Sequence, residues 1–112
     1  MINGNEVKKL KTVFPDLRLG KESSTEFIWI RGLVLPEGCD PEVLDGLVCS
    51  TPRDGYPTRL YLSQKILHGG PGKNWNANGV QILGKSWWAV SWRVESRNLL
   101  ELVQNHLRAF SK

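Results

Sequence analysis

The chain has 112 residues, the size of one domain, and we take residues 1–112 as a single domain. Apolar residues make up 40% and charged residues 23%, as in ordinary globular proteins. No apolar run has the length of a membrane span, and residues 1–12 lack the apolar core of a signal peptide. We therefore expect a cytoplasmic protein with no membrane partner.

The formal net charge is +4, and the basic residues are dispersed along the chain rather than gathered in a run. A nucleic-acid-binding surface usually shows as a clustered basic stripe. The charge pattern thus favours a solvated basic surface, which could also receive an acidic protein partner. Nucleic acid is the less favoured partner.

The first element predicted is a short helix. Val7, Leu10 and Phe14 recur at the spacing of one helix face, Asn5 can cap the start and Pro15 ends it. The residues that follow, 20–24, are expected to form a loop.

Three strands are predicted next. Residues 25–35 are rich in β-branched and aromatic side chains and end at a Pro-Glu-Gly turn. Residues 42–50 alternate less cleanly, and residues 59–64 are predicted as a strand from the alternation of Leu60 and Leu62. Residues 51–57 hold two prolines and a glycine, and cannot form a regular element.

In the last third of the chain, the sequence predicts a loop, then short segments whose structure it leaves open, and then a helix. Residues 68–79, rich in glycine and asparagine, are expected to be loop, and residues 80–83 a brief apolar segment. Residues 87–94 fit a strand or an irregular packed segment equally well. Ser96 can cap a helix with an apolar stripe at helical spacing. The fold class predicted is α+β: an N-terminal helix, an antiparallel β-meander and a C-terminal helix.

The two cysteines do not predict a metal site or a disulfide. Cys39 and Cys49 stand ten apart, and the only histidines, His68 and His106, are far along the chain, so a set of three or four ligands is not formed. We expect Cys49 to be a buried thiol and Cys39 to lie in an exposed turn. No metal and no cofactor are predicted.

A series of short motifs carries a family resemblance. In order these are Leu35-Pro36-Glu37-Gly38, Pro52…Gly55-Tyr56-Pro57, Asn78-Gly79, Gly84-Lys85-Ser86-Trp87 and Ser91-Trp92, followed by the final helix. The order resembles the ubiquitin-conjugating-enzyme superfamily, and more closely its bacterial branch, the prokaryotic ubiquitin-conjugating-like family E. The resemblance covers nearly the whole chain.

The resemblance implies a ubiquitin-conjugating-like fold in a bacterial ubiquitin-like modification pathway. The implied partners are a ubiquitin-like protein and its activating enzyme. Conventional members carry a thiol just after the Asn-Gly, where this chain has Val80-Gln81-Ile82. Thioester transfer needs a thiolate, so we expect an atypical carrier or a binding scaffold.

Other nucleophiles remain open. Ser86 or Ser91 could act as an acyl acceptor if paired with a base, and His68 is the candidate base. The alternative is that His68 only structures its loop by hydrogen bonding, which we favour.

The aromatic residues suggest where a partner binds. Three tryptophans crowd residues 87–92, and strand alternation cannot bury all of them. An exposed tryptophan beside arginine suits a protein interface, and it equally suits stacking on a single-stranded nucleic-acid base. A small basic nucleic-acid-binding module is therefore the alternative function. The binding residues predicted are Tyr56, Trp75, Asn78, Trp87 and Trp92.

Overall fold

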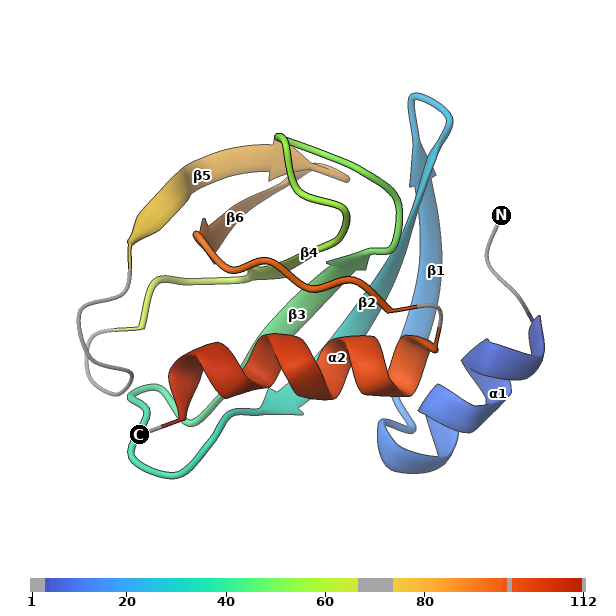
Figure 1. Ribbon diagram of the computed structural model, residues 1–112, viewed down its shortest axis with the longest axis horizontal. Helices are drawn as coiled ribbons and strands as arrows, with labels where there is room; N and C mark the ends of the chain where they lie inside the picture. The colour runs from blue at the N-terminus through green and yellow to red at the C-terminus, as the bar shows by residue number, and fades with distance from the viewer. Residues whose placement is uncertain (1–3, 67–73, 97, 112) are drawn as a thin grey trace.

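The computed structural model describes residues 4–66, 74–96 and 98–111. Over these residues the protein is α+β, as predicted, with two α-helices, a 3-10 turn and one six-stranded antiparallel sheet (Figure 1). The elements are α1 (Gly4–Val13), β1 (Leu17–Glu22), β2 (Thr25–Val34), β3 (Val43–Cys49), β4 (Arg59–Leu62), β5 (Trp75–Ile82), β6 (Lys85–Val90), α2 (Leu99–Leu107) and η1 (Arg108–Phe110).

The strand order is β1-β2-β3-β4-β6-β5, so only the first four strands form the predicted meander. In the last hairpin the second strand, β6, pairs with both β4 and β5, so β5 forms the edge of the sheet. The burial pattern explains why β6 rather than β5 lies next to β4. Strand β6 buries Trp87, Ala89 and Val90, whereas β5 exposes Asn76 and Asn78 and therefore belongs at the edge.

Two sequence predictions about loops are wrong. Residues 20–22 belong to β1, and the turn to β2 is only Ser23-Ser24, both with positive φ (49° and 69°). Such a tight turn matches strand twist but usually uses Asn or Gly, so its serines gave no turn signal. Residues 75–79 belong to β5, in which a bulge with Gly79 at φ 73° accommodates the glycine.

The C-terminal helix begins later than predicted. Asn98, rather than Ser96, caps α2, because its side-chain oxygen accepts from the backbone N–H of Glu101 at 3.1 Å. Ser96 instead supports the cap residue, with its Oγ 3.2 Å from the N–H of Asn98. The face that α2 buries includes His106 as well as apolar residues.

The sheet has a core on each side. Alternate residues of β2, including Ile28 and Ile30, face α1 and α2 and form the larger core with Leu10 and Val103. In Figure 1, α2 crosses β2 and β3 with α1 beside its end. The residues in between, Phe27 and Trp29 among them, face away from the helices into a smaller core with the following buried residues: Leu47, Cys49, Tyr61, Ala77, Ile82, Trp87 and Ala89.

The curled sheet itself closes the smaller core. The turn between β5 and β6 reaches the β1–β2 hairpin, where the N–H of Leu83 donates to Oε1 of Glu22 at 2.9 Å. A Cβ added at Gly20 would lie 2.7 Å from Cδ1 of Leu83, so glycine allows this close approach. The contact brings the beginning of β6 close to β1 and β2.

Candidate functional site

The Tyr-Pro turn predicted to be important is the centre of a hydrogen-bonded group. Arg53 and Tyr56 exchange two backbone hydrogen bonds of 2.9 Å across the Asp54-Gly55 turn. The Tyr56 hydroxyl lies 2.6 Å from Oγ of Ser91 and accepts from Nδ2 of Asn76 at 2.8 Å. The fold thus brings together Tyr56 and Ser91, which are 35 residues apart in the chain and were both predicted as site residues from the sequence.

Arg59 completes this group, which we call the Tyr56 cluster (Tyr56, Arg59, Asn76 and Ser91). Its guanidinium lies 4.3 Å from the Tyr56 ring centroid and donates to Oδ1 of Asn76 at 2.7 Å. Arg59 is only 2% exposed, so its charge is compensated by an aromatic face and an amide oxygen. Arg59 and Asn76 were not predicted as site residues from the sequence. For Arg59 a signal was available, because it is a charged residue in a strand that was predicted from its alternating leucines.

Beneath the cluster, His106 is held neutral. Burial, and to a lesser degree the nearby charge of Arg59, lowers the pKa of His106 to about 4. Its Nε2 lies 2.8 Å from Oγ1 of Thr58, whose hydroxyl donates to the carbonyl of Val94 at 2.7 Å. Because that hydroxyl has a single proton, Nε2 of His106 must be the donor. The nitrogen facing Thr58 is therefore not available as a base.

The serines predicted as nucleophiles have no base beside them among the described residues. Oγ of Ser86 accepts from the side-chain amide of Gln81, and Ser91 bonds the Tyr56 phenol. His68, the predicted base, lies outside the described residues, so a pairing with Ser86 or Ser91 stays a prediction.

Both cysteines are buried free thiols. Cys49 is fully buried, as predicted. The expectation of an exposed Cys39 is wrong, because the end of the chain covers its turn and its Sγ lies 3.7 Å from the carbonyl of Phe110. Burial, and secondly the charge of Glu42, raises the pKa of Cys39. Neither thiol is placed to act as an acyl carrier.

Of the residues predicted to bind a partner, Trp87, Trp75 and Asn78 differ in how far they are exposed. Trp87 is fully buried and donates its N–H to the carbonyl of Ile82 at 2.9 Å, so no partner reaches it in this structure. Trp75 is half-buried and stacks on Phe110, with ring centroids 6.2 Å apart. Asn78, exposed on β5, donates to the carbonyl of Trp75 at 3.2 Å.

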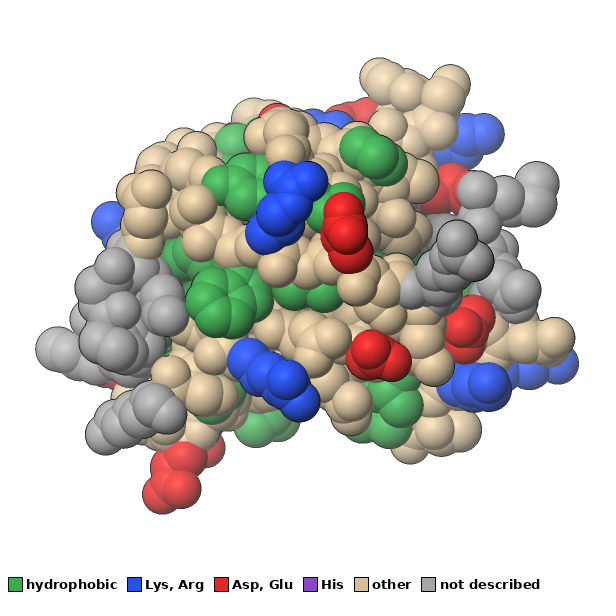
Figure 2. Space-filling view, in the orientation of Figure 1, with side chains coloured by type: hydrophobic (Ala, Val, Ile, Leu, Met, Phe, Trp, Pro, Cys, Tyr) green, Lys and Arg blue, Asp and Glu red, His purple; other side chains and the backbone are tan. Residues whose placement is uncertain are grey.

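Trp92 is the predicted tryptophan that lines a surface hollow. It is half-buried and donates to the carbonyl of Asn105 on α2 at 3.0 Å. A shallow hollow of about 260 Å³, which we call the Trp92 face, is lined by Trp92, Arg93, Val94, Glu95, Asn105 and Arg108. Figure 2 views the side of the molecule that carries α2, where apolar side chains reach the surface between separated basic and acidic ones.

The Trp92 face adjoins the Tyr56 cluster. Arg93 donates to the carbonyl of Gly55 at 3.3 Å, and Ser91 directly precedes Trp92. Tyr56, Ser91 and Trp92 therefore belong to one continuous region. Arg108 begins η1, directly after α2, so its place in the lining with Trp92 depends on how α2 packs.

Comparison with known proteins found no match: no family model, no curated protein and no solved structure is significantly similar to this chain. Among the residues that the structure describes, no group of three or more His, Cys, Asp or Glu side chains is arranged to hold a metal ion. In the same residues, no helix is long and apolar enough to cross a membrane.

Proposed function

We propose that this chain is a member of the ubiquitin-conjugating-like superfamily, close to its prokaryotic family E, and serves as a binding scaffold in a ubiquitin-like modification pathway. The proposal rests on the order of motifs in the sequence. It is also consistent with a helix, a four-stranded antiparallel meander, a Tyr-Pro turn, a tryptophan segment and a closing helix in succession.

The observation that carries the scaffold role is the lack of an activated nucleophile in the described part of the chain. Cys39 and Cys49 are buried, and Ser86 and Ser91 are bonded to an amide and a phenol. Neither an amide nor a phenol is the kind of adjacent base, such as histidine, that activates a serine. Acyl transfer at neutral pH has no support from these groups.

The Trp92 face is the surface proposed to receive the partner, a ubiquitin-like protein or its activating enzyme. Trp and Arg are among the residues most enriched at protein-interface hot spots, and here Trp92 lines the same hollow as Arg93 and Arg108. The hydrogen bond from Trp92 to Asn105 fixes the indole before binding, which reduces the entropy lost on association.

The test is reconstitution with a cognate activating enzyme, its ubiquitin-like protein and ATP. We expect no covalent adduct by intact mass, and measurable binding to one of the two proteins by calorimetry. Trp92→Ala should weaken that binding by roughly tenfold or more. Leu19→Ala is the control, since it removes an apolar side chain that is 60% exposed elsewhere, on β1. An adduct, or the absence of all binding, would overturn the scaffold proposal.

A nucleic-acid-binding module is the second candidate. It is favoured by the presence of Trp92 and two arginines in the lining of one hollow, because proteins hold single strands with basic side chains and aromatic faces. It predicts that a single-stranded oligonucleotide quenches tryptophan fluorescence and that affinity falls steeply with salt. Binding to the protein partners with a shallow salt dependence contradicts this candidate.

A further inference from the structure

A second pocket lies on the side of the sheet that α2 does not cover. Residues from four strands line it, and its volume is about 230 Å³. We call it the Trp29 pocket, and its lining residues are Arg18, Trp29, Arg31, Asp45 and Lys85. Three of the five are cations and one is an acid.

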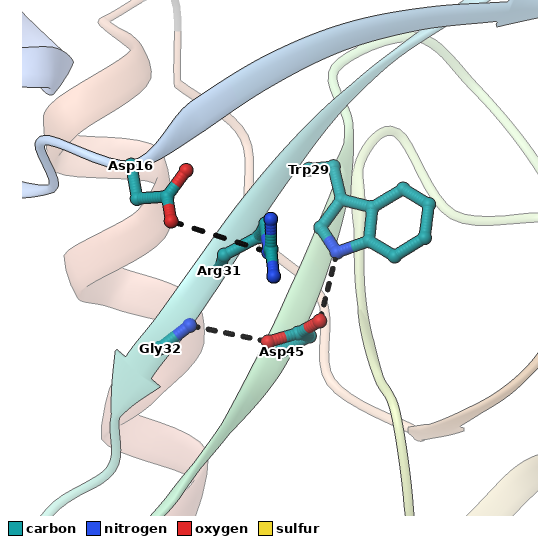
Figure 3. A network of polar contacts seen from close by, with 5 residues as sticks. All are labelled: Asp16, Trp29, Arg31, Gly32 and Asp45. Atoms are coloured by element: carbon teal, nitrogen blue, oxygen red, sulfur yellow. Dashed lines mark hydrogen bonds and ion pairs between the residues drawn. The ribbon is translucent and has the colours of Figure 1, made fainter.

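The floor of the Trp29 pocket is held by hydrogen bonds and a ring contact. Nε1 of Trp29 donates to Oδ2 of Asp45 at 3.0 Å, and the N–H of Gly32 donates to Oδ1 of the same carboxylate at 3.1 Å (Figure 3). Gly32, with φ 68°, sits in the β2 bulge that turns its N–H toward Asp45. The indole also meets Trp87 edge to face, with centroids 5.2 Å apart.

Asp45, the one carboxylate among the described residues that line the pocket, already accepts hydrogen bonds from the protein. Both oxygens of Asp45 accept hydrogen bonds from the protein, so it holds the floor rather than pairing with a pocket cation. Arg31 has only a distant partner outside the pocket, Asp16 at 4.0 Å, with both side chains about half exposed. A pair of that kind contributes little.

The cations converge from distant parts of the chain. Arg18 on β1 is the register partner of Trp29 on β2. Lys85 begins β6, and the contact between Leu83 and Glu22 brings that end of the hairpin across the sheet. The Lys85 ammonium lies 5.3 Å from the Trp29 ring centroid. In the described residues, Arg18 and Lys85 form no ion pair.

We propose that the Trp29 pocket binds a small oxyanion, the phosphate or carboxylate group of a metabolite-sized ligand. Two guanidinium groups and an ammonium match the charge and the hydrogen-bond geometry of such a group. The volume is below the range usual for whole drug-sized ligands, which fits one anionic group. Lys85 and Trp87 already contact the indole, so a stacked base is not the ligand.

This site is separate from the Trp92 face and does not depend on the scaffold role. The experiment is a titration followed by the indole N–H resonances in NMR spectra, with the Trp29 signal assigned through Trp29→Phe. The probes are inorganic phosphate, pyrophosphate and citrate at constant ionic strength, so that phosphate and carboxylate ligands are distinguished. We expect saturable movement of the Trp29 signal with at least one probe.

The variants are Arg18→Gln, Arg31→Gln and Lys85→Gln, all at exposed positions where the fold should persist. Each should weaken binding about tenfold, the loss expected for one charge-assisted hydrogen bond. Lys9→Gln on α1 is the matched control, with the same change in net charge, and should stay within about twofold of the parent. Equal weakening in the control, or no saturable movement with any probe, would overturn the proposal.

Discussion

The Tyr56 cluster and the Trp29 pocket each place a cation against an aromatic ring, Arg59 over Tyr56 and Lys85 over Trp29, yet the two regions treat their charges differently. In the cluster, Arg59 is buried and its guanidinium is satisfied by Asn76 and the Tyr56 ring. In the pocket, Arg18, Arg31 and Lys85 remain at the surface. A buried charge must be satisfied within the protein, whereas a group of exposed like charges remains able to bind an anion. The first arrangement stabilises the fold, and the second is suited to a ligand.

The largest effect expected comes from removing the support beneath the pocket. Trp87→Ala deletes a fully buried indole that packs against Trp29, and it should cost about 3–5 kcal/mol of the free energy of unfolding. Urea denaturation measures the loss. Trp92→Ala, at a half-buried site, is the control and should cost clearly less. Equal costs would contradict the distinction between a core and a surface tryptophan.

The next effect concerns His106, the buried imidazole beneath the Tyr56 cluster. His106 has a pKa of about 4 in the folded protein and about 6.5 when unfolded, so the unfolded chain binds the proton more tightly. Its contribution to stability is complete above pH 6.5 and is lost as the pH falls toward 4, by up to about 3 kcal/mol. Denaturation midpoints between pH 7 and 4 should fall less steeply in His106→Gln. Parallel pH profiles would show that His106 is not the titrating group.

A smaller loss is expected where His106 meets Thr58. Thr58→Val removes the hydroxyl that accepts from His106 and donates to Val94, leaving two buried polar groups unpaired at a cost of about 1–3 kcal/mol. Thr12→Val is the matched control, because the Thr12 hydroxyl bonds the carbonyl of Lys9 at the exposed surface. Thermal unfolding should barely change in the control. A similar loss in both variants would refute the bridging role of Thr58.

The fold was largely predictable because its strongest patterns are local. Residues 25–34 form a strand, as their β-branched and aromatic side chains indicate, and residues 99–107 form a helix, as their apolar periodicity indicates. Strand β1 was missed because its turn uses two serines, and β5 because an edge strand can hold asparagine and glycine. The insertion of β6 between β4 and β5 depends on long-range pairing that no local pattern records.

The candidate sites were predictable only in part, for a related reason. Tyr56, Ser91 and Trp92 could be chosen from the sequence, and the fold brings them into one region. The burial of Trp87 could not be read from a cluster of three tryptophans, since alternation does not say which face is covered. The Trp29 pocket was not foreseen at all, because it depends on the Leu83–Glu22 contact that closes the curled sheet.

The smallest effect expected sharpens the comparison most directly. Asp45→Asn retains one acceptor oxygen, for Trp29 or Gly32, so the free energy of unfolding should fall by about 1 kcal/mol. It also removes the one negative charge that the described residues contribute to the pocket lining. The same change should tighten oxyanion binding severalfold, because the anion no longer faces a carboxylate. An unfolding curve of the variant measures the change in stability, and a phosphate titration measures the change in affinity. Asp40→Asn, exposed and outside the pocket, should alter neither quantity. Weaker phosphate binding in Asp45→Asn than in Asp40→Asn would mean that Asp45 holds the floor in its binding-competent form, and that rigidity there outweighs charge.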